Sequence, residues 1–125
     1  MVQQMSDAEL ELMKIVWGNP SEVTRFSDLM DALAARGKEC QKNTLTVLLS
    51  RLMNKGFLHA RKLGRRNEYT ALVSEREYQT AQTRRFLDKV YEGSVEGLVS
   101  NLIMGDLLDG EEYEELKRLL EIGKP

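Results

Sequence analysis

Residues 42–72 read KNTLTVLLSRLMNKGFLHARKLGRRNEYTAL, and this stretch decides the fold. Four leucines in it recur at the spacing of one helix face: Leu45, Leu48, Leu49 and Leu52. With Gly56 as a C-terminal cap, they predict a helix from about Lys42 to Lys55. Residues 57–63 and 68–72 then read as two extended segments, separated by the polar residues 64–67. The stretch therefore predicts a helix followed by a β-hairpin with a basic tip.

The residues before this stretch predict two more helices and a short strand. Ser6 and Glu9 form a capping box, which predicts a first helix from about Asp7 to Trp17. A β-prone segment at 23–26 follows, and Ser27 is expected to cap a second helix that stops at Gly37. Helix, short strand, helix, helix and hairpin is the order of the winged helix, a helix-turn-helix variant whose third helix enters a DNA groove.

The residues after the hairpin predict a separate helical part. A second capping box, Ser74 with Glu77, opens a helix to about Glu92, and apolar periodicity predicts helices at about 95–104 and 111–122. The expected fold is mostly α with a small β-hairpin: a winged-helix domain at 1–73 and a three-helix domain at 74–125.

Three short helices make a thin core, because units this small seldom bury enough apolar surface alone. A second copy of the chain is therefore expected to complete it, so that 74–125 is a dimerisation domain. The expected interface residues are Phe86, Leu87, Val90, Leu98, Val99, Leu102, Ile103, Leu116, Leu119 and Leu120.

Composition places the chain among globular proteins and argues against metal chemistry. The 125 residues are 42% hydrophobic and 30% charged. No apolar run reaches the roughly 20 residues of a membrane helix and no secretory signal opens the sequence, so a cytoplasmic location is expected. Cys40 and His59 are the sole residues of their types, too few for a disulfide or a protein-built zinc site, and their expected roles are structural. We expect no metal, no cofactor and, without a catalytic constellation, no enzyme.

The net charge of −2 hides an uneven distribution of charge. Residues 36–66 hold nine basic residues and one acidic residue, whereas residues 74–125 hold seven basic and twelve acidic ones. This asymmetry predicts a phosphate-facing surface in the first part of the chain and a different task for the second.

Helical geometry selects the residues expected to contact double-stranded DNA. With the leucines in the core, the polar residues of 42–51 point outward, where the first ones reach bases and Arg51 reaches phosphate. The hairpin tip is expected to meet the backbone or the minor groove. The predicted DNA-binding residues are Lys42, Asn43, Thr44, Thr46, Val47, Arg51, Lys62, Arg65 and Arg66. The alternatives are a solvated helix face, a hairpin tip that serves solubility, and a local capping role for the Thr44 hydroxyl.

Several motifs together resemble one family along nearly the whole chain. They are Ser6-Asp7-Ala8-Glu9 with Trp17, the run Asn43 to Leu52, Lys55-Gly56, Tyr69-Thr70, Phe86-Leu87, Tyr91 to Ser94, and Leu98 to Leu102. The chain resembles the BlaI/MecI penicillinase-repressor family of winged-helix regulators.

The resemblance implies a transcriptional repressor that binds a palindromic operator as a homodimer. In the β-lactam-responsive members, which regulate antibiotic resistance, a sensor-protease pathway leads to cleavage of the repressor at an Asn-Phe bond in the dimerisation segment. The matching bond here is Asn101–Leu102, in which Leu replaces Phe. Another inducer, or none, is the alternative to proteolysis. The alternative function is a winged-helix module that binds a protein partner without sequence-specific DNA binding.

Overall fold

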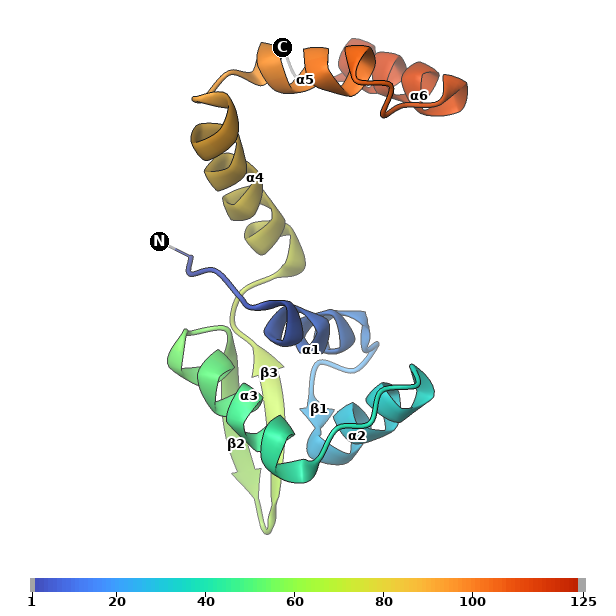
Figure 1. Cartoon of the computed structure of the whole chain (residues 1–125). Coiled ribbons are helices and arrows are strands. Elements are labelled where there is room, and N and C mark those ends of the chain that lie inside the picture. Colours follow the sequence, from blue (N-terminus) through green and yellow to red (C-terminus); the bar gives the residue numbers. More distant parts are fainter. Residues whose placement is uncertain (1, 124–125) are drawn as a thin grey trace. The chain divides into compact units, whose positions relative to one another are not determined.

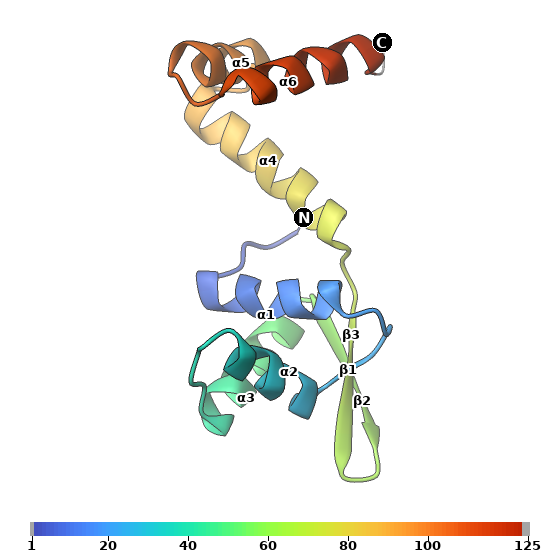
Figure 2. The same ribbon diagram turned by 90° about the vertical axis from the view of Figure 1, so that its right-hand side faces the viewer.

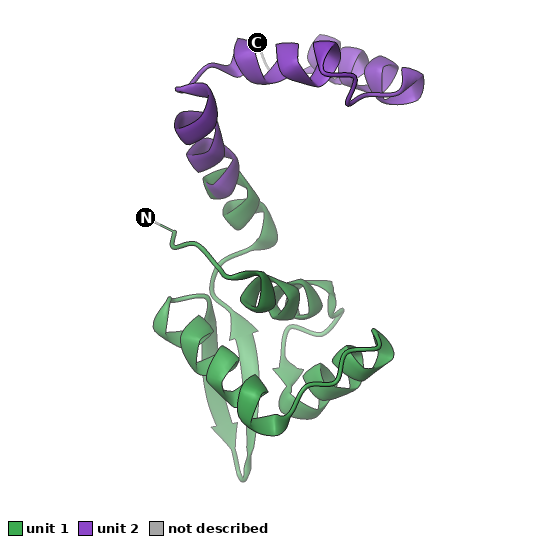
Figure 3. Cartoon of the chain, in the orientation of Figure 1, with its two compact units in different colours: residues 1–81 green, residues 82–125 purple. Residues whose placement is uncertain are grey.

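The computed structural model describes residues 2–123, which form six helices and three strands in the order α1, β1, α2, α3, β2, β3, α4, α5 and α6 (Figure 1). The chain divides into two compact units, residues 1–81 and 82–125 (Figure 3). The predicted fold class, mostly helical with a small antiparallel sheet, is confirmed.

Helix α1 (Asp7–Gly18) begins at the predicted capping box. The Ser6 N–H donates to Glu9 Oε1 over 2.7 Å, and the Glu9 N–H donates to Ser6 Oγ over 3.2 Å. The helix buries Leu12 and Met13 in the core of the first unit. Ser6 and Glu9, the two residues of the capping box, thus lie where the local sequence predicts them.

Helix α2 (Phe26–Ala35) corrects one expected cap. Ser27 was expected to precede the helix, but it lies inside the first turn. The Asp28 carboxylate reaches back from that turn and accepts a hydrogen bond of 2.9 Å from the Arg25 N–H. The helix therefore begins one residue before Ser27. At its other end Gly37 adopts a φ of 73°, a conformation that favours glycine, as predicted for the stop.

The sheet has the strand order β1-β3-β2 and is antiparallel throughout. Its strands are β1 (Thr24–Arg25), β2 (Leu58–Leu63) and β3 (Arg66–Ala71). The hairpin connection is shorter than the predicted 64–67, because Leu63 pairs with Arg66 and Lys62 with Asn67. Gly64, with a φ of 63°, is the first residue of a two-residue turn, the position that glycine takes in a type II′ turn. The polar residues 66 and 67 therefore lie in the strand, where no core covers them.

Helix α3 (Lys42–Asn54) and the first turn of α4 (Glu75–Tyr91) complete the first unit (Figure 2). Tyr78 of α4 is buried, its hydroxyl accepts a hydrogen bond of 2.9 Å from the Met5 N–H, and Phe57 meets its ring edge-on at 5.6 Å. The packing of this unit thus continues to Ala81, eight residues beyond the expected boundary at 73. The functional division into 1–73 and 74–125 remains a prediction.

A buried ion pair joins α1 to the end of α3. The Glu9 side chain is 1% exposed, and its Oε1 accepts a hydrogen bond of 2.6 Å from Lys55 Nζ. The same ammonium group donates to the Gln4 carbonyl over 3.1 Å. Glu9 Oε2 is buried and has no hydrogen-bond partner among the described residues. The carboxylate therefore depends on Lys55 and Ser6 for its compensation.

This pair predicts acid sensitivity. Burial by itself raises the pKa of the Glu9 carboxyl, but the hydrogen bonds from Lys55 and Ser6 together lower it by more. The pKa in the folded state therefore lies below the usual 4.5. A carboxyl group with a depressed folded pKa stabilises the protein above its unfolded pKa, and that contribution disappears as the pH falls through the folded pKa. We expect urea denaturation midpoints to fall as the pH decreases below about 4.5. The Glu9→Gln variant should lose less stability over the same pH interval, and an equal loss in both proteins would contradict this assignment.

The second unit contains the rest of α4, with α5 (Val95–Met104) and α6 (Gly110–Ile122). Helix α4 ends at Tyr91, two residues before Gly93, whose φ is 83°. Asp109 is the N-cap of α6, and its Oδ1 accepts a hydrogen bond of 2.8 Å from the Glu112 N–H. The three expected helices are thus present.

Candidate nucleic-acid interface

Helix α3 presents a polar face to solvent. Its core side is formed by Leu45, Leu49 and Leu52, each at most 1% exposed, and Leu48 packs half-buried against that core. The residues that α3 leaves exposed are Lys42, Asn43, Thr44, Thr46, Val47, Ser50, Arg51 and Asn54. Every α3 residue predicted to contact DNA therefore lies on this exposed face.

The two threonines of that face differ in their hydrogen bonding. The Thr46 hydroxyl donates to the Lys42 carbonyl over 2.9 Å, four residues earlier in the helix. Its proton is thus engaged by the helix backbone, and the methyl group is left for apolar contact. The Thr44 hydroxyl makes no hydrogen bond within residues 2–123, so no local cap engages it there.

The hairpin of β2 and β3, hereafter the wing, carries cations on both faces. Because cross-strand partners share a face, Leu63 and Arg66 lie on one side and Lys62 and Asn67 on the other. Arg65 occupies the turn itself. The three predicted wing cations therefore point in different directions, and a single groove of DNA does not face all three equally.

The basic charge of this region is almost uncompensated. Residues 40–67 contain seven basic residues and no acidic one, and Lys55 is paired with Glu9. The other six form no ion pair within residues 2–123: Lys42, Arg51, Arg61, Lys62, Arg65 and Arg66. An anionic partner that contacts α3 and the wing would supply the missing counter-charges.

Metal binding finds no support in the described part of the chain. No group of three or more His, Cys, Asp or Glu residues there could hold a metal ion. Cys40 is half-buried beside the loop into α3, and His59 is exposed on β2. No helix among residues 2–123 is long and apolar enough to cross a membrane.

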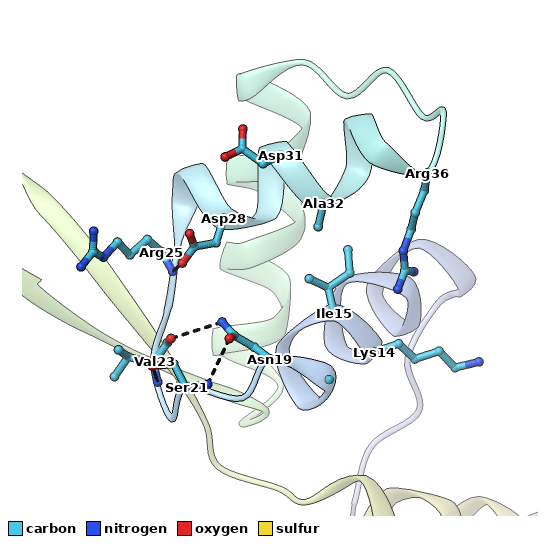
Figure 4. A pocket seen from close by; sticks show the side chains of 11 residues that line it. Lys14, Ile15, Asn19, Ser21, Val23, Arg25, Asp28, Asp31, Ala32 and Arg36 are labelled. Carbon is cyan, nitrogen blue, oxygen red and sulfur yellow. Dashed lines mark hydrogen bonds between the residues drawn. The ribbon is translucent and has the colours of Figure 1, made fainter.

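A cavity of about 570 Å³ lies between α1, the following loop and α2 (Figure 4). Its lining mixes signs, with three basic residues, Lys14, Arg25 and Arg36, beside Asp28 and Asp31. Asn19 is engaged by the loop, since its amide donates to the Val23 carbonyl and its Oδ1 accepts from the Ser21 N–H. The two carboxylates in its lining and the engaged amide distinguish this cavity from the basic surface of α3 and the wing.

The second unit exposes most of its apolar side chains. Leu87 alone is buried among its described residues, and neither α5 nor α6 has a buried residue. The large apolar side chains that it exposes are Phe86, Val90, Val95, Ile103, Met104, Leu107, Tyr113, Leu119, Leu120 and Ile122. Leu98, Val99, Leu102 and Leu116 are half-buried. Of the residues predicted for the dimer interface, Leu87 is therefore already covered within the single chain.

The second unit also contains the predicted cleavage bond. Asn101–Leu102 lies inside α5, where the Asn101 carbonyl accepts a hydrogen bond of 2.8 Å from the Gly105 N–H. The Asn101 amide also donates to the Tyr91 hydroxyl over 3.0 Å. The bond is therefore part of a regular helix.

One exposed cation near the wing, Arg25, is not among the predicted DNA-binding residues. It lies at the end of β1 and pairs in register with Glu68 of β3. In the sequence it stands outside the basic stretch 36–66. The pairing of a two-residue strand with β3 leaves no recognisable signal in the sequence.

The fold, with its exposed cations on α3 and the wing, places the chain in the winged-helix class of DNA-binding proteins. The family model described as penicillinase repressor matches residues 5–122, and the chain belongs to this family of transcriptional repressors, which are not enzymes. The penicillinase repressor of Bacillus licheniformis is 37% identical over 120 residues, which cover 96% of this chain and 91% of that protein. The methicillin resistance regulatory protein MecI of Staphylococcus aureus is 29% identical over 117 residues, covering 94% and 93%.

Two solved structures resemble part of the chain. The DNA-binding domain of the repressor BlaI matches with a TM-score of 0.54 and 32% identity, covering 62% of this chain and 92% of that one. The monomeric form of Bacillus licheniformis BlaI in complex with the blaP half-operator matches with a TM-score of 0.51 and 33% identity over the same shares. These structural similarities support the winged-helix fold and agree with the family assignment.

Proposed function

We propose that this chain is a transcriptional repressor that binds a palindromic DNA operator as a homodimer. The observation that carries the proposal is the cluster of six unpaired cations on α3 and the wing, in a fold that resembles BlaI bound to a half-operator. The site residues and the dimer interface that follow are parts of the proposal.

Helix α3 is the element that reads sequence. Lys42 and Asn43 lie in its first turn, and both side chains can address purine edges in the major groove. Thr46 and Val47 follow on the same exposed face and offer methyl groups to thymine. Arg51, two turns further along, contacts phosphate, as does Thr44 with its free hydroxyl.

The wing adds affinity that depends little on sequence. Arg65 lies in the turn, and Arg66 and Lys62 lie on opposite faces of the hairpin. These three side chains contact backbone phosphates or the minor groove. Contacts of this kind set the position of the protein on the duplex, while α3 selects the bases.

Dimerisation through the second unit converts two weak half-site contacts into one tight complex. The exposed apolar side chains of α4, α5 and α6 supply the surface that a second copy would cover. Linking two binding modules commonly raises affinity by about a hundredfold or more, so separating the protomers releases the operator without a change in α3. Repression then follows from occlusion of the promoter by the bound dimer.

Cleavage of the Asn101–Leu102 bond is the proposed route to induction. Because the bond lies inside α5, a protease would first have to unwind that helix locally. A sensor-protease pathway is the expected partner for this step, and an inducer that acts without proteolysis is the alternative.

The wing predicts a large and salt-dependent effect. Replacing both Arg65 and Arg66 with alanine should weaken binding to the DNA upstream of the protein's own gene by about a hundredfold near 0.15 M salt. The slope of log affinity against log salt should become shallower by about 2, because two phosphate contacts are lost. Fluorescence anisotropy over a salt series measures both quantities.

The matched control removes two cations from elsewhere in the same unit. Lys14→Ala with Arg36→Ala changes the net charge equally but leaves the wing intact, and it should alter the affinity less than about threefold. Equal losses in the two double variants would show that net charge, and not wing contact, governs binding.

A further inference from the structure

A groove beside the wing brings together three arginines from separate parts of the chain. Arg25 comes from the end of β1, Arg65 from the hairpin turn and Arg66 from the start of β3. The first residues of α2, with Asn67 and Tyr69, complete the lining of a cavity of about 430 Å³. The groove thus depends on the antiparallel pairing of β1 with β3.

The direction of Arg25 is settled by its neighbours in the strand. Thr24, which precedes it, is buried opposite Tyr69, so that Arg25 alternates to the other face of the sheet. Arg25 also lines the cavity between α1 and α2, and Figure 4 shows its side chain extending from the start of α2 toward the hairpin strands. Asp28, the acidic residue next to it, accepts its hydrogen bond from the Arg25 backbone N–H and not from the guanidinium group.

The arginines of the groove have no carboxylate at ion-pairing distance among the described residues. No acidic residue lines the groove in the described part of the chain. Glu68 is the nearest acidic residue in register, and it stands opposite both Arg25 and Arg61. Since guanidinium groups match the oxygens of a phosphodiester in a planar, two-pronged geometry, the groove fits that anion.

We infer that Arg25 is a further phosphate-binding residue of the DNA interface, and that the groove holds a backbone phosphodiester beside the wing. The inference rests on the proposed function and extends it to a residue outside the basic stretch 36–66. The end of β1, the start of α3 and the hairpin turn lie at the same end of the first unit (Figures 1 and 2), as a common DNA surface requires. Because phosphates carry no sequence information, Arg25 raises affinity for every duplex alike.

The test uses the full chain and three single variants, with anisotropy over a salt series on the operator duplex and on a random duplex of equal length. Arg25→Gln should bind both duplexes about tenfold more weakly near 0.15 M salt, and its salt slope should be shallower by about 0.9. Arg25→Lys retains the charge and should keep the wild-type slope. Arg36→Ala removes one charge at the opposite end of α2 and should bind within about twofold of wild type.

The possible outcomes separate the inference from the proposed function. A wild-type protein that binds neither duplex in a salt-dependent manner would contradict the proposed function itself. If wild type binds and Arg25→Gln behaves like Arg36→Ala, the inference alone is overturned. A loss confined to the operator duplex would also overturn it, because that pattern indicates a base contact. Thermal unfolding of Arg25→Gln at the wild-type midpoint would exclude a folding defect as the source of the loss.

Discussion

Replacing Lys55 with methionine is expected to lower the free energy of unfolding by about 3 kcal/mol. The substitution keeps an apolar stem of similar length. It removes the ammonium group that donates hydrogen bonds to the Glu9 carboxylate and the Gln4 carbonyl. The Glu9 carboxylate is 1% exposed, so it would be left buried with hydrogen bonds from Ser6 alone. Urea denaturation at neutral pH measures the change.

The matched control breaks an exposed ion pair between the same two types of residue. Lys38 bonds Glu11 over 3.0 Å, with the lysine side chain 58% exposed. Lys38→Met should therefore change stability by less than about 0.5 kcal/mol. In a double variant that also carries Glu9→Gln, part of the loss caused by Lys55→Met should be recovered, because no charge remains buried. A similar small effect in both single lysine variants would contradict the role assigned to the buried pair.

Placing two charges in the apolar surface of the second unit is expected to reduce operator affinity by about a hundredfold. Ile103 and Leu120 are 46% and 66% exposed, so aspartate at both positions leaves the packing of the single chain intact. Two copies could then not cover these surfaces without burying unpaired carboxylates. Sedimentation equilibrium should show monomers where the wild-type protein forms dimers.

A half-site duplex provides the internal control for this variant. Under the proposed function one winged-helix unit binds one half-site by itself, so the Ile103→Asp, Leu120→Asp protein should match wild type there. Leu72→Asp, which charges an exposed leucine of the first unit, should leave the protein dimeric. An unchanged affinity for the full operator in the monomeric variant would contradict the avidity mechanism.

Local sequence predicted the fold where residues near in sequence determine it. The capping boxes at Ser6 and Ser74 and the glycine stops at Gly37 and Gly56 lie where the helices begin and end. Ser27 failed as a cap because the Asp28 carboxylate bonds the Arg25 N–H, so that Arg25 is the N-cap and Ser27 lies in the first turn. The hairpin turn was predicted too long because polar residues in an uncovered strand resemble a turn.

In the candidate site, too, local sequence predicts one part, and long-range contacts determine the other. The exposed face of α3 follows from the spacing of its leucines, so helical periodicity was sufficient to predict it. The groove at Arg25 depends on which strand pairs with β1, and the burial of Leu87 depends on the packing at the end of α4. Neither of these long-range choices is encoded in a short window of sequence.

Charge required a regional count, because the net charge of −2 conceals the basic surface. The second unit is acidic, and its charge masks the cations of α3 and the wing in any total taken over the chain. The family resemblance and the regional count led to the same function independently.

Transcription in a purified system tests the central claim most directly. Run-off transcription from the promoter upstream of the protein's own gene should fall as the full chain occupies the operator. Operator occupancy and loss of transcript should reach half of their maximum at the same protein concentration. The Ile103→Asp, Leu120→Asp variant should require about a hundredfold more protein for the same repression. Full occupancy of the operator with undiminished transcription would contradict the account of this chain as a dimeric repressor.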